Sequence, residues 1–159
     1  MAAMHAFGAP YSVRMLEIDN VGMFDTEVEN QGKVFVTTEL GGAGTSSART
    51  VAIARQGIRN LLIHAGILQG TLQKKPTVEL DMPDARCFMF AECPGLIEYL
   101  VDLGEPVVQG QPLARIWAAD RTGVPPQVCQ ATRDGIFTAR HIPGLIKMGD
   151  FISLIAVKV

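Results

Sequence analysis

The sequence predicts an α/β segment over residues 1–74, followed by an all-β barrel or sandwich over residues 75–159. The first observation is a β-branched run that ends in glycines and leads into an apolar pattern of helical spacing. The second is a series of short strand candidates separated by Gly and Pro, which fills the rest of the chain. The third is the polar, Pro-containing stretch Gln73–Pro76, which separates the two patterns.

Two strand candidates precede the helical pattern. Ser12–Asp19 (SVRMLEID) alternates between two sets of side chains, which favours a strand but leaves open which face is buried. Lys33–Leu40 (KVFVTTEL) is rich in β-branched residues and is bounded by Gly32 and by Gly41–Gly42. We therefore expect a buried strand here that runs into a glycine turn.

One long amphipathic helix is predicted from about Ser47 to about Leu68, after several residues that can cap a helix start. It tolerates Gly57 at a cost of about 1 kcal/mol, and it ends near Gly66 or Gly70. The apolar side is formed by Val51, Ala54, Ile58, Leu61, Leu62, Ala65 and Leu68. The opposite side is formed by Arg49, Gln56 and Asn60.

The α/β part is incomplete by this interpretation. Two strands and one helix cannot cover both faces of a sheet, although parallel sheets in α/β folds are normally covered on both. We therefore expect the strand at Lys33–Leu40 and the apolar side of the helix to be partly uncovered. A chain of this kind is expected to self-associate.

Short strand candidates at even spacing follow the polar stretch, which is typical of a compact barrel or sandwich. The segments that begin at Gly95 and at Gly135 share a similar order of glycines and apolar residues, so two repeated halves are predicted. The candidates are Thr77–Leu80, Cys87–Ala91, Gly95–Val101, Pro112–Ala118, Pro126–Ala131, Gly135–Ala139 and Phe151–Val157.

The composition excludes several classes of protein. The chain has 14 Lys and Arg against 16 Asp and Glu, so it offers no basic field for nucleic acid or for an anionic membrane. No apolar stretch approaches the roughly 18 residues of a membrane span, and no basic region with an apolar core opens the chain. We expect a soluble, cytoplasmic protein.

The cysteines and histidines indicate neither a disulfide framework nor a metal site. The cysteines are odd in number and include no CxxC pair, so buried reduced thiols are expected. None of the histidines is followed three or four residues later by Glu, Asp or His, so no metal ligand is predicted. The residues are Cys87, Cys93, Cys129, His5, His64 and His141.

Glu39 is the candidate catalytic residue. It stands in TTELGG, at the C-terminal end of the expected strand, where ligands bind in open α/β sheets. A carboxylate there can act as a general base; the alternative is an ordinary Glu that accepts hydrogen bonds from nearby amides. The neighbouring glycines lack the spacing of phosphate-binding loops, so nucleotide binding is not expected.

Other reactive residue types are assigned structural roles. His64 lies near the expected helix end, where a charged imidazole would be favoured, but a structural histidine is the preferred interpretation. Cys93 has no identified histidine to orient it as a nucleophile and is expected in the core. Four arginines could clamp a carboxylate, with solvated helix charges as the alternative. These are Arg14, Arg49, Arg55 and Arg59.

Three blocks of sequence carry a resemblance to a known family. They are KVFVTTELGGAGT around Glu39, the helix ARTVAIARQGIRNLLIHAGIL, and FAECPGLIEYLVDLGEPVVQGQPLARIW in the β part. Together they resemble the succinylglutamate desuccinylase/aspartoacylase family over nearly the whole chain. Within that family the chain is most similar to deacylases that act on N-acetylated diamino acids of the diaminobutyrate type.

The resemblance implies a zinc-dependent amidohydrolase with an α/β lobe like that of zinc carboxypeptidases and a C-terminal β domain. In such enzymes zinc, held by an HxxE pair and a later His, activates water, and a late-strand Glu is the general base. Only that Glu is carried over here, onto Glu39, because HxxE is absent from the 159 residues. The resemblance therefore implies the C-terminal part of a longer, oligomeric enzyme for N-acyl amino acids. This chain alone is expected to bind no zinc and to be inactive.

A second interpretation gives the β part a role without chemistry. Its two halves are similar to those of biotinyl/lipoyl-like domains. A carrier of biotin or lipoate needs a lysine at the hairpin tip between the halves, but residues 118–128 contain none, and Lys147 lies in the turn of the second half. The alternative function is therefore a non-catalytic binding or oligomerisation module.

Overall fold

The computed structural model describes residues 1–16 and 22–159, and it divides into two compact units. Of the described residues, the helical unit contains residues 1–12 and 22–79, and the β unit contains Val13–Leu16 and Leu80–Val159. The expected division into residues 1–74 and 75–159 stays a prediction. Among the described residues, no helix combines the length and the apolar character needed to cross a membrane.

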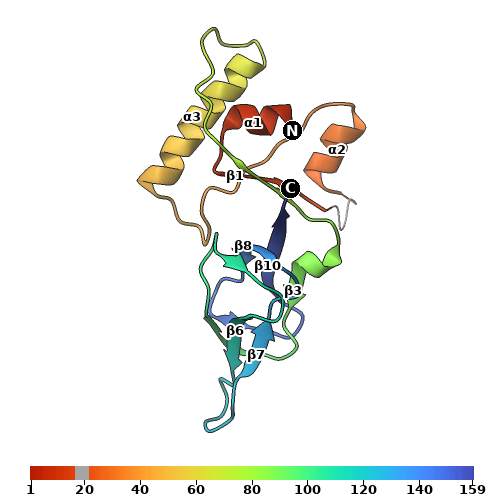
Figure 1. Cartoon of the computed structure of the whole chain (residues 1–159), viewed down its shortest axis with the longest axis vertical. Helices are drawn as coiled ribbons and strands as arrows, with labels where there is room; N and C mark the ends of the chain where they lie inside the picture. The colour runs from red at the N-terminus through yellow and green to blue at the C-terminus, as the bar shows by residue number, and fades with distance from the viewer. Residues whose placement is uncertain (17–21) are drawn as a thin grey trace. The chain divides into compact units, whose positions relative to one another are not determined.

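The described part of the helical unit contains the helices α1, α2 and α3, and α1 lies beside α3 (Figure 1). The close approach requires a glycine, because a Cβ at Gly57 would collide with the Phe7 ring of α1. α1 ends at Gly8, which adopts a left-handed φ of 74° that glycine accepts without strain. The helices are α1 (Ala2–Phe7), α2 (Phe24–Asn30) and α3 (Ala48–His64).

The expected long helix is present as α3, but the prediction of its buried side is wrong. Asn60, expected on the polar side, is fully buried together with Gly57, whereas Val51 and Ile58 of the expected apolar side are exposed. The reason is local packing. Gly57 admits Phe7, and the Asn60 amide pairs with the backbone that crosses α3, so this side of the helix faces the rest of the unit.

Lys33–Leu40 does not form the expected buried strand. It has no assigned strand structure, and most of its residues are exposed. A strand needs a neighbour to pair its backbone N–H and C=O groups, and none of the described strands pairs with this segment. The strand expected over Ser12–Asp19 is limited to β1 (Tyr11–Arg14), and its expected end at residues 17–19 lies outside the described residues.

All the strands expected after residue 76 are present, within one or two residues of their expected bounds. Two very short strands, β5 and β9, were not anticipated. The strands are β2 (Val78–Asp81), β3 (Phe88–Phe90), β4 (Gly95–Tyr99), β5 (Pro106–Val107), β6 (Pro112–Trp117), β7 (Gln127–Gln130), β8 (Gly135–Arg140), β9 (Leu145–Ile146) and β10 (Phe151–Lys158), with a 3-10 turn over Ala85–Cys87.

The strands form two sheets. The larger has the order β1-β2-β10-β8-β5, with β3 also paired to β10, and the smaller has the order β7-β6-β4-β9. The paired strands of known register are antiparallel, including β8 with β10 and β4 with β6. The β unit is therefore built from two sheets of short strands, in line with the all-β domain that was expected, while its assignment as a biotinyl/lipoyl-like fold stays a prediction.

The predicted internal repeat is visible in the pairing. β4, β5 and β6 of the first half correspond to β8, β9 and β10 of the second, and β5 pairs with β8 while β9 pairs with β4. Gly95 and Gly135 open the equivalent strands β4 and β8. A Cβ at Gly135 would lie 2.5 Å from the Ala156 carbonyl oxygen, and one at Gly95 would collide with the Trp117 carbonyl oxygen. Each half therefore contributes one short strand that pairs with a strand of the other half.

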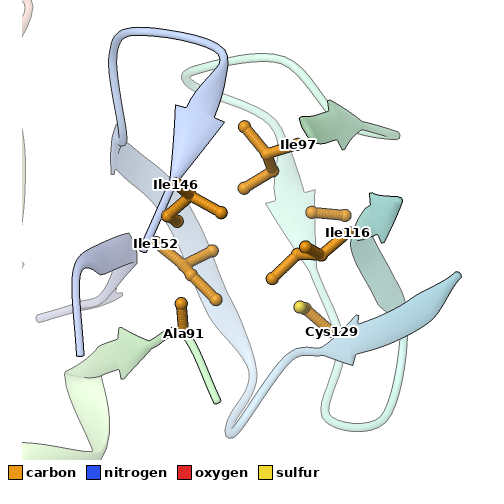
Figure 2. Close-up of a cluster of buried hydrophobic side chains, with 7 residues drawn as sticks. Ala91, Ile97, Ile116, Cys129, Ile146 and Ile152 are labelled. Carbon is orange, nitrogen blue, oxygen red and sulfur yellow. The ribbon is translucent and has the colours of Figure 1, made fainter. Parts of the chain in front are cut away.

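The core lies between the two sheets of the β unit. Figure 2 shows Ile97 and Ile116 of the smaller sheet pointing toward Ile152 of β10, and the same cluster contains Ala91, Ala114, Cys129 and Ile146. A second cluster joins Leu113 of β6 to Phe137 and Ile155, all of them fully buried. Burial of such side chains contributes about 1.5–3 kcal/mol each, so the two halves are held together by their shared core.

Candidate functional site

Glu39 lies in an exposed part of the helical unit. It is the last residue but one of the Lys33–Leu40 segment, so it does not stand at the end of a formed strand as expected. Among the described residues, no side chain or backbone group makes a hydrogen bond or ion pair with its carboxylate. The carboxylate is thus accessible to a bound molecule.

A glycine-rich turn connects Glu39 to α3. Gly41 and Gly44 adopt left-handed φ angles of 111° and 65°. Thr45 closes the turn, because its backbone N–H and its hydroxyl both donate to the Gly42 carbonyl, at 3.0 and 2.7 Å. Ala43 is the non-glycine residue with positive φ among those described, at 56°. The turn is therefore defined by these bonds as well as by its glycines.

The first turn of α3 is capped by its own side chains. The Thr50 N–H donates to Ser47 Oγ at 3.1 Å, and the Ser47 N–H donates to Thr50 Oγ1 at 3.0 Å. This reciprocal arrangement satisfies two of the amides that a helix start leaves unpaired. It fixes the direction in which the chain leaves the glycine turn, and it uses amides that could otherwise bind an anion.

A cavity of about 390 Å³ lies beside α3 within the helical unit. Its wall is mostly apolar, and two cationic side chains, Arg49 and Lys75, contribute to it. Sequence reasoning considered Arg49 but missed Lys75, because a lysine beside a proline carries no positional signal until the chain is seen to cross α3. The wall is formed by Phe7, Gly8, Pro10, Arg49, Ala52, Ile53, Gln56, Gln73, Lys75 and Pro76.

Asn60 holds one wall of this cavity in place. Its Nδ2 donates to the Gln73 carbonyl at 3.0 Å, and its Oδ1 accepts from the Gln73 N–H at 3.1 Å. Gln56 Nε2 also donates to Asn60 Oδ1, at 3.1 Å. The amide therefore binds the crossing backbone as a neighbouring strand would, which explains why a polar residue is fully buried here.

The histidines are dispersed. His5 Nε2 lies 2.9 Å from Glu79 Oε1 in the helical unit, and His64 is exposed in the last turn of α3. His141 belongs to the β unit, where its backbone N–H donates to the Ile152 carbonyl and to the Tyr99 hydroxyl. In the described part of the chain, no group of three or more His, Cys, Asp or Glu side chains could hold a metal ion.

The cysteines lie in the β unit and carry free thiols. Cys93 packs against the core cluster that contains Cys129, and burial raises the pKa of the Cys129 thiol, with smaller contributions from Cys93 and Glu92. Cys87 is fully buried and accepts a hydrogen bond from Arg133 Nη1 at 3.2 Å. Cys93 is thus partly buried at the border of the core that the sequence led us to expect for it.

The candidate arginines do not converge. Arg14 Nε lies 3.9 Å from Asp81 Oδ1 in the β unit, while Arg49, Arg55 and Arg59 are exposed along α3. Of these, only Arg49 reaches the cavity wall. The structure therefore places no arginine pair around Glu39 among the residues it describes.

Comparison with known proteins identifies similar chains. Residues 1–65 match the succinylglutamate desuccinylase/aspartoacylase catalytic domain. The chain is 50% identical over 153 residues to N-alpha-acetyl-L-2,4-diaminobutyric acid deacetylase of Halomonas elongata, a match that covers 95% of this chain and 45% of that protein.

Solved structures of similar sequence have the same fold as this chain. The product-bound ectoine utilization protein EutE (DoeB) of Ruegeria pomeroyi superposes with a TM-score of 0.96 at 59% identity, over 98% of this chain and 48% of that chain. A succinylglutamate desuccinylase of Silicibacter sp. TM1040 gives 0.92 at 57% identity, over 99% and 48%. The chain thus spans about half the length of the relatives it matches, in their C-terminal part.

Proposed function

We propose that this chain is a member of the succinylglutamate desuccinylase/aspartoacylase family and forms the C-terminal part of a deacylase. The substrate class is N-acyl amino acids of the N-acetyl-diaminobutyrate type, and the bond broken is the amide. The observation that carries the proposal is the 50% identity over 153 residues to a deacetylase of that name. The same basis leads us to propose a cytoplasmic, homo-oligomeric enzyme.

Glu39 is proposed as the general base. Water adds to the acyl carbon as Glu39 takes one of its protons, and the carboxyl group then returns that proton to the nitrogen as the C–N bond breaks. The products are a carboxylic acid and a free amine, so atoms and charge balance. Two features support the assignment: the exposed carboxylate without a competing partner among the described residues, and the glycine turn next to it, whose small residues leave room for a substrate.

Zinc is the cofactor that the family resemblance implies. The described residues do not fit a zinc site, because no three potential ligands come together among them. We therefore propose that the metal ligands belong to the part of the relatives that precedes the matched region. By the same reasoning, the isolated chain is proposed to have no appreciable activity.

A chimera tests the assignment of Glu39. This chain replaces the matched C-terminal part of the Halomonas elongata deacetylase, and turnover of N-acetyl-2,4-diaminobutyrate is measured with added zinc. We expect an active chimera in which Glu39→Gln lowers kcat by about 100- to 10,000-fold with little change in KM. Glu29→Gln, an exposed carboxyl of α2, is the matched control and should retain activity. Equal activity of the two variants would remove Glu39 from the mechanism.

The isolated chain provides a second test. Purified and supplemented with zinc, it is expected to give no turnover of N-acetyl-amino acids above the rate without protein. Turnover that Glu39→Gln abolishes would overturn the proposal that the metal ligands lie outside this chain.

A second candidate function is an interaction role for the β unit. On the outer face of the smaller sheet, Leu96 pairs across the strands with Trp117 on one side and with Leu145 on the other, and all three are exposed. An apolar row of this kind is typical of a contact surface. Leu96→Ser should then lower the association state in sedimentation velocity, whereas Val124→Ser, in the exposed loop after β6, should not.

A further inference from the structure

The cavity of about 390 Å³ in the helical unit has no part in the proposed chemistry. Its walls come from three segments: the end of α1, the first half of α3, and the crossing segment Gln73–Pro76. The lining is mostly apolar, and its two largest apolar side chains, Phe7 and Ile53, are half-buried. Among the described residues that line the cavity, the charged ones are Arg49 and Lys75, so its charge is of one sign.

Contacts within the helical unit hold these walls in position. The Val78 N–H donates to the Pro10 carbonyl at 2.9 Å, which joins the chain just after the crossing segment to the chain just after α1. Gly8 lies against the Lys75 backbone, because a Cβ at Gly8 would be 3.5 Å from the Lys75 nitrogen. The two hydrogen bonds of Asn60 fix the start of the crossing segment on α3. The cavity is therefore formed before a ligand arrives, which lowers the ordering cost of binding.

The polar groups of the lining suit an anion. Neither Arg49 nor Lys75 forms an ion pair among the described residues. Gln56 Nε2 donates one hydrogen to Asn60 Oδ1 at 3.1 Å, and the same amide has a second hydrogen to donate. Two positive charges on a concave, mostly apolar wall attract an anion more strongly than they would in open solvent. Arginine also presents paired N–H groups that match the two oxygens of a carboxylate.

We propose that this cavity binds a small organic carboxylate with an apolar body. Arg49 and Lys75 hold the carboxylate, and the apolar body packs against Phe7 and Ile53. An inorganic anion would leave the apolar wall without a partner, and a neutral molecule would leave both cations without one. The volume lies within the range of about 300–1,000 Å³ that is usual for small-molecule sites. The inference does not depend on the proposed function, because Glu39 is not among the lining residues.

Phenylbutyrate is the probe for this site, because it joins a carboxylate to an apolar body. The whole chain, isotopically labelled, is titrated with it, and the amide chemical shifts are followed by NMR. We expect saturable shifts at the amides of Phe7, Ile53 and Lys75, with a Kd of about 0.1–10 mM, as is usual for a ligand of this size. Phenylbutanol, which lacks the charge, and inorganic phosphate, which lacks the apolar body, should each bind at least about fivefold more weakly.

Two pairs of variants test the assigned charges. Lys75→Met keeps an apolar stem but removes the ammonium group, and it should weaken phenylbutyrate binding by about three- to tenfold. Lys74→Met, one residue away and outside the lining, should change binding by less than about 1.5-fold. Arg49→Met and Arg55→Met repeat the comparison on α3, where Arg55 lies outside the lining. Because all four side chains are exposed, the variants should keep the unfolding temperature of the parent chain.

Each outcome decides for or against the site. Shifts that do not saturate by about 50 mM phenylbutyrate would overturn it, and so would equal weakening by Lys74→Met and Lys75→Met. Phenylbutanol that binds as tightly as phenylbutyrate would reduce the cavity to an apolar groove. Phosphate that binds as tightly would make it a site for inorganic anions, and either result would overturn the proposed ligand class. Weaker binding of both comparison compounds, with a loss of affinity confined to Lys75→Met and Arg49→Met, would support the proposal.

Discussion

Ile155 of the β unit and Ile58 of the helical unit show how the two units differ. Ile155 is wholly buried between sheets whose strands all come from this chain, whereas Ile58 is 55% exposed on a helix side that the described residues do not cover. The two residues have the same apolar volume. What differs is whether another helix or strand packs on the residue. The β unit supplies the elements that bury Ile155, whereas no described element covers Ile58.

The largest expected effect compares these two isoleucines. Ile155→Ala should lower the free energy of unfolding by about 2–5 kcal/mol, because it leaves a cavity in a closed core. Ile58→Ala should change it by less than about 0.5 kcal/mol, since the side chain makes few contacts that folding creates. Chemical denaturation of both variants measures the difference. Similar losses would show that the Ile58 side chain is already buried.

The repeated glycines provide the next test. Gly135→Ala should cost about 1–3 kcal/mol or more, because the new Cβ would meet the Ala156 carbonyl oxygen at 2.5 Å and Ile155 Cγ2 at 2.7 Å. Gly144→Ala is the control within the β unit, since its Cβ would meet only Leu96 Cδ1, at 3.4 Å. A thermal melt that ranks Gly144→Ala as the more damaging change would contradict the close strand approach at Gly135.

A smaller effect is expected at Asn60. Asn60→Ala removes both hydrogen bonds to the Gln73 backbone and should cost about 1–3 kcal/mol, less where water reaches the freed groups. The crossing segment should then be cleaved faster near Gln73 in limited proteolysis. Gln69→Ala, an exposed amide after α3, is the control, and its cleavage pattern should match that of the parent chain.

The smallest effect depends on pH. The hydrogen bond from Arg86, aided by the charges of Arg86 and Arg133, lowers the pKa of Asp84 from 3.8 to about 2. A carboxyl with a lowered pKa stabilises the fold above its unfolded pKa, and that contribution is lost as the pH falls toward the folded value. The parent chain should therefore be slightly more stable than Asp84→Asn at neutral pH, and the difference should shrink between about pH 4 and pH 2. A difference that grows on acidification would contradict the assigned ion pairs.

The sequence predicted the β unit well because its signals are local. Alternation, glycines and prolines define strands such as β4 and β10, and their partners lie a turn or a half-repeat away. The two-residue strands β5 and β9 carry too little pattern to be recognised before their pairing is known.

The helical unit was predicted less well because its signals depend on partners. Helical periodicity located α3 and its apolar side, but periodicity does not say which side of a helix packs against a neighbouring element. The buried side contains Gly57, which makes room for the Phe7 ring, and Asn60, which hydrogen-bonds the Gln73 backbone. Neither contact can be recognised from the sequence before the fold is known. Lys33–Leu40 has strand propensity without a strand beside it among the described residues, and propensity alone does not form a ladder.

The candidate site was located only in part. The motif around Glu39 identified a candidate carboxylate and the glycine turn that follows it, and its catalytic role stays a prediction. Lys75 and Gln73 were missed because they belong to no motif. They line the cavity only because the backbone after α3 runs back across that helix.

The exchange of β5 and β9 between the two halves has a mechanical consequence. Residues 119–125, which join β6 to β7, are exposed, so a protease can sever the chain there. The resulting pieces would still be interlocked, because each supplies an edge strand that the other requires. A nicked β unit should therefore migrate as a single species under native conditions and come apart only when denatured.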